Sequence, residues 1–275
     1  MSSKNKQEET NKESSLINDI IEKKELRNLD VDIARKILED YTKENPKLIL
    51  KVQEKNYNKK SKEYKQLVKE VRKKLREIYG VFQIPGKREK LLEQDKIEEI
   101  LNYHKSTKER TGYYTEVYEN ILEITGKGSI IDLACGLNPI AYNYLGYKPE
   151  YFASDISTKD LEFINKFFLK KGIPGKTRRI DLVEEKEEIT KIKSDICFLF
   201  KTLDSLEARK KNISKWIINN LNCEWIVVSF TKISLGGNKP IEKKRRNWFF
   251  NFLKTEKYQF FEFEIPNEFF IIIKK

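Results

Sequence analysis

Three aspartates occupy corresponding places in the chain, and their spacing suits the binding of a small polar ligand. Asp132, Asp155 and Asp181 each lie at or near the end of a short segment rich in β-branched and aromatic residues. When such segments form a parallel sheet, ligands bind outside the carboxyl ends of the strands. There, Asp155 could accept hydrogen bonds from ribose hydroxyls, and Asp181 could accept one from an adenine amino group. Carboxylates also attract positive charge, so we expect an adenosine compound that carries a cation.

The turn after Asp132 narrows the choice of ligand. It reads DLACGLNP (132–139), in which Gly136 would let the backbone approach a ligand closely. The chain contains no GxGxxG and no GxxxxGK[ST] motif, so the ligand needs no pyrophosphate. S-adenosylmethionine joins an adenosine to a sulfonium and an amino acid end, and it has no phosphate. The acids and the turn therefore favour S-adenosylmethionine; the alternative is that each aspartate only caps a helix or satisfies a turn.

A basic segment, HKSTKER (104–110), precedes the first of these strands. Its Arg110 could form a bidentate pair with a carboxylate, such as the methionyl group of that cofactor. The alternative is an ordinary helix with a surface arginine. His104 is the single histidine of the chain, and the pattern does not favour it as a general base.

The chain offers little for a metal site or a disulfide framework. It has three widely spaced cysteines, Cys135, Cys197 and Cys223, with no CxxC pair and one histidine. That composition argues against a zinc site and against paired disulfides. We expect no metal.

The segments that would hold these residues alternate between strand and helix. Seven runs read as strands: 129–135, 150–156, 177–183, 194–200, 224–230, 258–265 and 268–275. Helical stretches such as 158–171 and 206–221 lie between them. This alternation predicts an α/β fold with a mostly parallel, doubly wound sheet. Pro266-Asn267 separates the last two runs and predicts an antiparallel hairpin. We assign 104–275 to a Rossmann-like, seven-stranded class I methyltransferase domain.

The preceding part of the chain reads as a helical, basic domain. We assign residues 1–15 to a disordered tail, because they are polar, and 16–103 to an RNA-docking domain. Its clearest helix, 61–79, has apolar residues at i, i+3, i+4 and i+7. The opposite face is basic and poor in acids. It could bind RNA, and the alternative is that it is only exposed to solvent. The residues expected to contact RNA there are Lys69, Arg72, Lys73 and Arg76.

The composition agrees with a nucleic-acid partner. The 275 residues include 55 Lys and Arg against 43 Asp and Glu, a net charge of +12. Such a charge points to nucleic acid first and an anionic membrane second. No apolar run reaches the roughly 18 residues of a membrane span. The first twenty residues lack the apolar core of a signal peptide, so we expect a cytoplasmic protein.

Five motifs together resemble a known family. HKSTKER and DLACGLNP are followed in order by FLFKTLDSLE (198–207), VSFTKISLGGNK (228–239) and NWF (247–249). The set resembles the aminoglycoside-resistance 16S rRNA methyltransferases, the family of ArmA, RmtB and FmrO. The resemblance implies a helical rRNA-docking domain and a Rossmann-like domain that binds S-adenosyl-L-methionine. It also implies methylation of N7 of a guanine in the decoding site of the small ribosomal subunit. We expect the protein to be a monomer.

The resemblance carries residue roles with it. Arg110 would hold the methionyl carboxylate, and Phe200 and Lys201 would lie near the methyl group and the target base as the candidates for a catalytic role. Asp155 would bind the ribose, and Asp181 and Leu182 would flank the adenine. The cofactor-binding residues that it implies are His104, Lys105, Ser106, Arg110, Ala134, Gly136, Asp155, Ile156, Asp181, Leu182 and Phe200.

The sequence departs from the family pattern around the target-base region. Ala134 stands where a glycine is usual, and Asp204 and Thr231 each replace a proline. Four consecutive cations, Lys243, Lys244, Arg245 and Arg246, replace a less charged stretch. We expect the loop 234–246, which leaves the carboxyl end of a strand, to clamp rRNA phosphates with these cations.

Guanine N7 carries a lone pair and no proton, so methyl transfer to it needs no general base. The residues at the end of the run 194–200 and just after it, FKTLD (200–204), lack the [DN]PP[YF] motif of exocyclic-amine methyltransferases. Cys135 and Cys197 lie in a turn and a strand, where packing is their expected role, and neither is placed as the nucleophile of cytosine-C5 chemistry. Three alternatives stay open. One is a housekeeping relative of the resistance enzymes, another is a methyltransferase of a different structured RNA, either tRNA or another rRNA site, and the third is an RNA-binding protein with a degenerate cofactor pocket.

Overall fold

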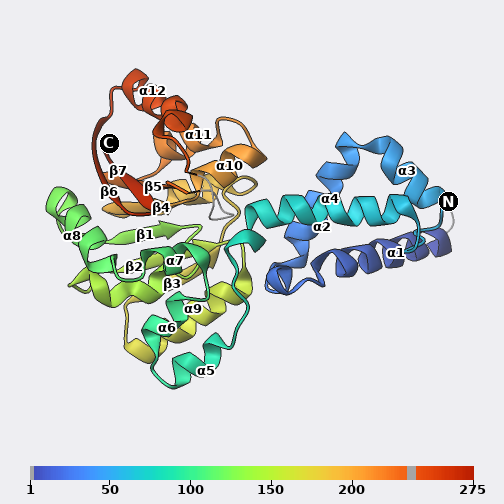
Figure 1. Ribbon diagram of the computed structural model, residues 1–275, viewed down its shortest axis with the longest axis horizontal. Coiled ribbons are helices and arrows are strands. Elements are labelled where there is room, and N and C mark those ends of the chain that lie inside the picture. The colour runs from blue at the N-terminus through green and yellow to red at the C-terminus, as the bar shows by residue number, and fades with distance from the viewer. Residues whose placement is uncertain (1–2, 234–239) are drawn as a thin grey trace. The chain divides into compact units, whose positions relative to one another are not determined.

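The chain divides into two units at the junction between Pro85 and Gly86. The structure, a computed structural model, describes residues 3–233 and 240–275, except for the side chains of residues 3–10 and 243. Figure 1 draws the first unit in blue to cyan and the second in green to red. Across the described residues, no helix is long and apolar enough to cross a membrane.

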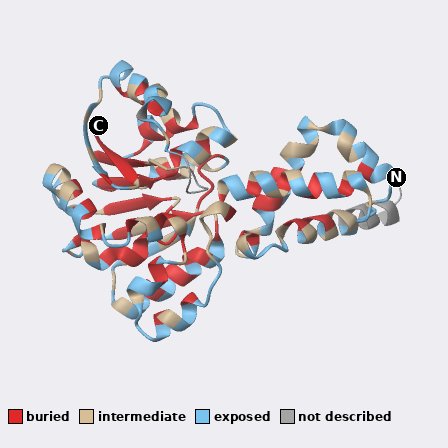
Figure 2. Cartoon of the chain, in the orientation of Figure 1, coloured by how far each residue is buried: buried red, intermediate tan, exposed pale blue. Residues whose placement is uncertain are grey.

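The first unit is made of helices. Its α-helices are α1 (Ser3–Ile21), α2 (Val31–Glu44), α3 (Pro46–Glu54) and α4 (Lys62–Ile78). Helix α4 has its hydroxyl cap at Ser61, which accepts a hydrogen bond from the N–H of Tyr64. Its apolar stripe, including Leu67, Val71 and Leu75, is buried, and α1 and α2 both pack against α4. Figure 2 shows the buried stripes of these helices in red.

Two boundaries differ from the sequence prediction. Residues 3–15, expected to be a disordered tail, continue helix α1, because they are rich in Lys, Gln and Glu and lead into the buried Leu16 and Ile17. The helical domain also ends at Pro85 and not at residue 103. Leu92 and Ile100, which follow that boundary, are part of the core that lies on the sheet.

The second unit holds a seven-stranded sheet in the order β3-β2-β1-β4-β5-β7-β6. The strands are β1 (Ile130–Leu133), β2 (Tyr151–Asp155), β3 (Gly175–Arg179), β4 (Ile196–Phe200), β5 (Trp225–Thr231), β6 (Gln259–Ile265) and β7 (Glu268–Lys274). Strands β1 to β5 are parallel, and β7 is antiparallel to both β5 and β6. This confirms the predicted doubly wound sheet with its terminal hairpin.

Helices cover both faces of the sheet. They are α5 (Arg88–Glu93), α6 (Ile97–Leu101), α7 (Lys105–Arg110), α8 (Tyr114–Thr125), α9 (Thr158–Lys171), α10 (Leu203–Arg209), α11 (Ile213–Asn220) and α12 (Asn247–Thr255). Neighbouring strand residues point to opposite faces, so Ile130 joins one apolar core and Ile131 the other. The first core includes α8 and α9, and the second includes α10, α11 and α12.

The helix predicted over 206–221 is two helices. The first helix ends at Arg209, because Lys210 after it is extended, with φ of −150°, and Asn212 before the second helix has φ of +63°, in the left-handed region. Glu207 of the FLFKTLDSLE motif accepts hydrogen bonds from the N–H groups of Asn212 (2.8 Å) and Ser214 (2.9 Å). Glu207 therefore caps the start of α11.

Candidate functional site

The turn after β1 has the tight backbone that its glycine predicts. Gly136 has φ of +52°, and a Cβ placed there would lie 2.6 Å from both Cε1 and Nε2 of His104. Only glycine fits without moving that ring. Ala134 also has a left-handed backbone, with φ of +51°, which disfavours a residue with a side chain. Ala134, which stands where the family usually has a glycine, therefore adds strain to this turn.

Asp155 ends β2 and faces this turn. Its Oδ2 accepts a hydrogen bond from the N–H of Gly136 (2.9 Å), and its Oδ1 accepts one from the N–H of Ser157 (3.1 Å). Burial, and next the nearby charge of Asp160, raise the pKa of Asp155 to about 7. The structure thus brings together Gly136 and Asp155, both of which are expected to contact the cofactor. The carboxylate of Asp155, beside the turn, titrates near neutral pH.

His104 packs on the turn as a neutral side chain. It is 8% exposed, and burial lowers its pKa to about 4. Asp160 opposes that shift, and the cations Arg110, Lys201 and Arg88 add to it. The imidazole therefore carries no charge at neutral pH, and it forms an uncharged wall next to Gly136.

Arg110 is buried and already has several partners. Its Nε donates to Glu268 (3.0 Å), its Nη1 donates to Asn138 Oδ1 (2.6 Å) and Tyr114 Oη (3.2 Å), and its Nη2 donates to Ser106 Oγ. A guanidinium has five N–H groups, and these bonds use four of them. Among the described residues, the fifth N–H, on Nη2, has no acceptor. A bidentate grip on a ligand carboxylate would require Ser106 to give up its bond.

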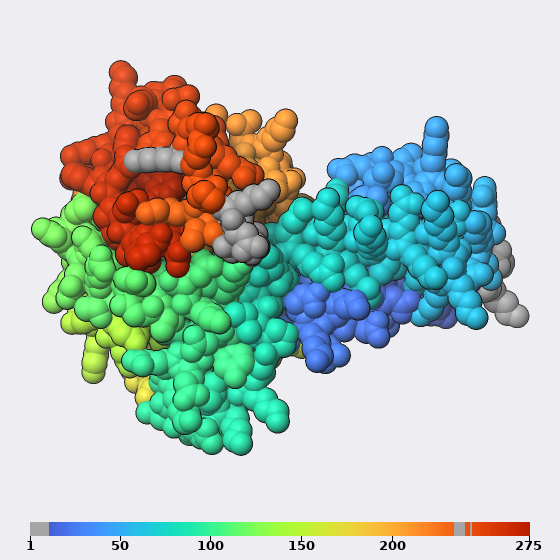
Figure 3. Space-filling model, viewed as in Figure 1, coloured from blue at the N-terminus to red at the C-terminus, as the bar shows by residue number. Residues whose placement is uncertain are grey.

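Glu268 is the partner of Arg110 that the sequence analysis missed. It is the first residue of β7, and because β7 runs antiparallel to β5, its start lies at the carboxyl ends of the parallel strands. Its carboxylate also accepts a hydrogen bond from Ser229 and lies 3.0 Å from the Nζ of Lys201. Burial alone would raise the pKa of Glu268, yet Arg110 and Lys201 hold it below its usual value. In Figure 3 the C-terminal residues (red) border the green segments, in keeping with this contact.

The two candidates for a catalytic role, Phe200 and Lys201, border the same ion network. Lys201 has φ of +56°, and its Nζ lies 2.5 Å from the carboxylate of Glu109 and 3.0 Å from that of Glu268. The guanidinium of Arg110 lies 4.8 Å from the ring centre of Phe200. The structure therefore collects both residues at the expected edge, with the Lys201 ammonium held between two carboxylates.

Asp132, the first of the three acids, is buried and bonded to other side chains of the protein. Its carboxylate accepts hydrogen bonds from Tyr151 Oη (2.6 Å) and Asn138 Nδ2 (2.8 Å), and the residue is 1% exposed. Burial raises the pKa of Asp132 to about 6. Asp132 orients Asn138, which in turn accepts from Arg110. Asn138 of the DLACGLNP motif is thus a link between two buried charges.

Asp181 lies two residues beyond β3, whose end at Arg179 comes earlier than the run 177–183 suggested. Its Oδ1 accepts a hydrogen bond from the N–H of Val183 (2.9 Å), which closes a turn after the strand. Both carboxylate oxygens also bind Arg209, at 2.8 Å each. Leu182, the other residue expected at the adenine, is buried beside it.

The remaining cofactor candidates lie around the same edge. Lys105 and Ser106 start α7, and Ile156 follows Asp155. Ser106 is buried, and Lys105 and Ile156 are partly buried. Their role in binding a cofactor stays a prediction, and the ion network of Arg110, Glu268 and Lys201 is what the structure adds.

The basic face of α4 has two kinds of cation. Lys69 and Lys73 are exposed and make no ion pair with any described residue. Arg72 is partly buried and donates to the carbonyl oxygens of Ile20 (3.1 Å) and Asp19. Arg72 therefore joins α4 to the end of α1, and Arg76 pairs with Glu25 at 2.8 Å.

The predicted four-cation clamp is corrected at Arg246. Arg246 is 2% exposed; its Nη2 binds the carboxylate of Asp204, and its guanidinium lies 5.0 Å from the ring centre of Phe230. Lys244 pairs with Glu242 at 2.5 Å, and Arg245 is exposed. Residues 234–239 of the expected loop and the side chain of Lys243 lie outside the described residues.

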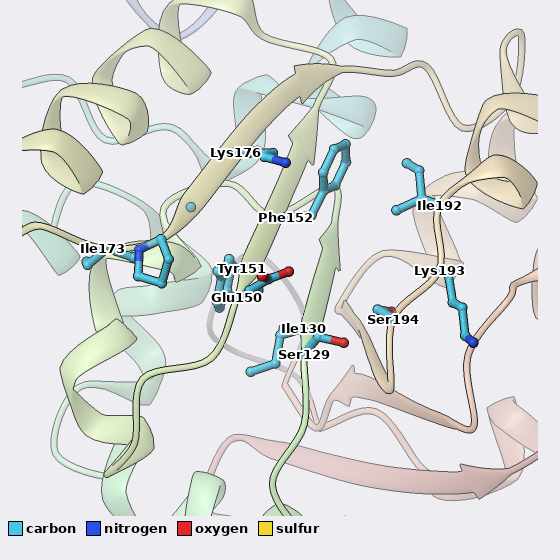
Figure 4. Close-up of a pocket in the computed structure, with 12 residues that line it drawn as sticks. Ser129, Ile130, Glu150, Tyr151, Phe152, Ile173, Lys176, Ile192, Lys193 and Ser194 are labelled. Carbon is cyan, nitrogen blue, oxygen red and sulfur yellow. The ribbon is translucent and has the colours of Figure 1, made fainter.

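A separate hollow of about 380 Å³ lies at the amino ends of the parallel strands, opposite the carboxyl ends described above. Its lining includes Ser129, Glu150 and Gly175, at the amino ends of β1, β2 and β3. Figure 4 shows Ser129, Tyr151 and Lys176 around it. The hollow is therefore distinct from the cluster at the carboxyl ends.

The chain is similar to known rRNA-modifying enzymes. The family model described as Ribosomal RNA methyltransferase (FmrO) matches residues 39–271. A 16S rRNA (guanine(1405)-N(7))-methyltransferase of Micromonospora rosea is 29% identical over 236 residues, which are 76% of this chain and 82% of that protein. The enzyme of the same name from Proteus mirabilis is 29% identical over 202 residues, 63% of this chain and 70% of its own.

Solved structures share the fold. The 16S rRNA methyltransferase RmtF, in complex with S-adenosyl-L-homocysteine, has a TM-score of 0.78 at 23% identity, covering 95% of this chain and 97% of that one. The 16S rRNA methylase ArmA has a TM-score of 0.58 at 26% identity, covering 70% of this chain and 99% of that one.

Proposed function

Since the chain belongs to the FmrO family of ribosomal RNA methyltransferases, we propose that it transfers a methyl group from S-adenosyl-L-methionine to N7 of a guanine in the decoding site of 16S rRNA. The family membership confirms the resemblance that the motifs indicated. The observation that carries the proposal is the extent of the match, residues 39–271, which takes in parts of both units. The substrate would be the assembled small ribosomal subunit in the cytoplasm, approached by a monomer, and the mark would protect against aminoglycosides.

The residues at the carboxyl ends fit the cofactor. Gly136 lets the ring of His104 pack directly on the turn that would lie beside the cofactor. Asp155 would take the ribose hydroxyls, Asp181 and Leu182 would flank the adenine, and Arg110 would meet the methionyl carboxylate through its remaining N–H. When bound, the cofactor supplies an electrophilic methyl group on a positively charged sulfur.

This chain's residues would act by placing the two reactants. Guanine N7 needs no proton removed, which agrees with a site whose histidine is neutral and packed against the turn. The ammonium of Lys201 is held by Glu109 and Glu268. Catalysis would then come from aligning the methyl group with N7 and from excluding water.

Two surfaces would dock the rRNA. Lys69 and Lys73 of α4 present charges that no described carboxylate neutralises. Arg245 is exposed at the end of the loop after β5. Phosphate contacts of this kind supply affinity and register on RNA, and base contacts supply specificity.

The test is to map the modified nucleoside. Purified 30S subunits lacking the mark are incubated with the protein and S-adenosylmethionine, and the rRNA is digested and analysed by mass spectrometry. We expect one 7-methylguanosine per subunit, within the decoding-site fragment. Methylated adenine or cytosine, or methylation of tRNA in its place, would contradict the proposal. Cofactor binding without methylation of any RNA would favour an RNA-binding protein over an enzyme.

A further inference from the structure

Asp181 and Arg209 form a buried ion pair at the edge of the sheet where the cofactor would bind. Arg209 Nη1 lies 2.8 Å from Asp181 Oδ1, and Nη2 lies 2.8 Å from Oδ2. The side chains of Arg209 and Asp181 are 8% and 3% exposed, respectively. Two parallel bonds between a planar guanidinium and a carboxylate fix the plane of the carboxylate as well as its position.

The bonds to this carboxylate are divided unequally between its oxygens. Oδ1 accepts from Arg209 and from the N–H groups of Val183 (2.9 Å) and Glu184 (3.4 Å). Oδ2 accepts from Arg209 alone among the described residues. A carboxylate oxygen has two lone pairs, so Oδ2 keeps one acceptor position, in a plane that Arg209 sets.

We propose that Arg209 is a positioning residue that aims the Oδ2 of Asp181 at the exocyclic amino group of the cofactor's adenine. The inference rests on the proposed function, because it takes an adenosine cofactor as the ligand. An amino group is a donor, and Oδ2 offers an acceptor to it. Arg209 itself touches neither the adenine nor the reacting atoms.

The backbone around both residues supports a fixed geometry. The N–H of Asp181 donates to Glu185 (2.8 Å), which holds the turn after β3. Arg209 ends α10, whose Leu203 and Leu206 are buried, and Glu207 of the same helix caps α11. Burial alone would raise the pKa of Asp181, yet the bonds and charge of Arg209 keep it below its usual value. The carboxylate is therefore an ionised acceptor.

A purely structural pair would look the same, so the test must single out the adenine amino group. Binding of S-adenosylhomocysteine and of its analogue with purine in place of adenine is measured by calorimetry. The analogue lacks only the amino group. In the parent we expect the analogue to bind about tenfold more weakly, the size of one hydrogen bond to a charged group.

In Arg209→Met the ratio between the two ligands should fall towards one, because Asp181 no longer has a set orientation. Arg209→Lys keeps the charge and loses the fork, so it should give an intermediate ratio, and it serves as the folded variant should the methionine variant unfold. Arg179→Met is the matched control: Arg179 pairs with Glu185 at 3.2 Å in the same turn, and its removal should leave the ratio as in the parent.

A structural role predicts that both ligands weaken by the same factor in Arg209→Met and Arg209→Lys, with the ratio preserved, and that result would overturn the inference. A ratio of one in the parent would overturn it as well. A parent that binds neither ligand would instead contradict the proposed function. The two failures are therefore distinct.

Discussion

At the scale of single residues, the site is a set of buried charges that depend on one another. Glu268 stands between Arg110 and Lys201, and Asn138 joins Arg110 to Asp132. Removing one partner of a buried ion pair leaves the other charge uncompensated in a medium of low dielectric constant. The stability of the protein should therefore depend on Glu268. A separate prediction concerns Asp155, whose titration should change the affinity for the cofactor.

Glu268→Gln should strongly destabilise the protein. It leaves Arg110 and Lys201 without their shared anion, a loss of about 3–5 kcal/mol in the free energy of unfolding. Glu264→Gln is the control, since Glu264 is an exposed partner of Lys232 and such pairs contribute about 0–1 kcal/mol. Urea unfolding at neutral pH measures both. Equal losses in the two variants would show that the buried anion matters no more than the exposed one.

Cofactor affinity should rise with pH through neutrality because of Asp155. Its pKa near 7 means that the free protein holds a proton there below neutral pH, whereas ribose hydroxyls donate best to the ionised form. Binding then releases that proton, and affinity should fall by up to about tenfold per pH unit below 7. His104, with a pKa near 4, does not titrate in this range. Calorimetry with S-adenosylhomocysteine from pH 6 to 8 measures the slope; Asp155→Asn should bind more weakly and with a flat profile. A parent profile as flat as the variant's would contradict the assignment.

At the scale of elements, the turn after β1 and the loop after β5 contain residues that depart from the family pattern. Ala134, where a glycine is usual in the family, has a left-handed backbone. Arg246 at the end of the loop after β5 binds Asp204 at the start of α10. The charge at 204, which replaces a proline, and the charge at 246 thus form one pair between the start of α10 and the segment before α12.

Ala134→Gly should raise the free energy of unfolding by up to about 1 kcal/mol. It removes the strain of a side chain in the left-handed region, and the greater freedom of glycine in the unfolded chain offsets part of the gain. Ala153→Gly makes the same change in the buried strand β2 and should lower stability by about 1 kcal/mol or more. Chemical denaturation compares the two. A loss of stability in both variants would mean that residue 134 is not strained.

Arg246→Met and Arg245→Met should separate a structural cation from an RNA-binding one. Without the bond to Asp204 and the packing on Phe230, Arg246→Met should have a free energy of unfolding lower by about 1–2 kcal/mol. Arg245→Met should leave thermal unfolding unchanged and weaken binding to 30S subunits. The measurements are calorimetric melting and subunit binding by filter retention. The reverse pattern would restore Arg246 to the predicted clamp.

At the scale of the whole molecule, the net charge of +12 does not say which cations are available to RNA. Of the four residues expected to meet RNA on α4, Lys69 and Lys73 have no such partner in the described chain, whereas Arg72 and Arg76 are joined to the helical unit itself. Counting basic residues therefore overstates the RNA-binding surface.

Lys69→Ala with Lys73→Ala should weaken binding to 30S subunits and flatten its dependence on salt. For each phosphate that the variant no longer neutralises, the slope of log affinity against log salt should fall by about 0.7–0.9. The control removes two exposed lysines from helices of the sheet unit, Lys166 and Lys254. Both double variants should bind S-adenosylhomocysteine as the parent does. Equal salt slopes in the two variants would leave α4 without a docking role.

The sequence by itself determined the order of strands and helices, the sheet with its terminal hairpin, and the family. Alternating short apolar runs and helical stretches are local patterns, and Gly136 and Asp155 mark a turn and a strand end whatever surrounds them. Motif order added the family, because several short motifs in sequence are more specific than any one of them.

Only the tertiary structure decided which charges face a ligand and which face each other. Glu268 is 158 residues from Arg110 in the chain, and only the antiparallel return of β7 brings its carboxylate to the carboxyl ends of β4 and β5. The same holds for Arg209 with Asp181 and for Arg246 with Asp204. Glu268 and Arg209 read as ordinary residues of a strand and a helix in the sequence, because ion pairing depends on distance in space, which no local pattern records.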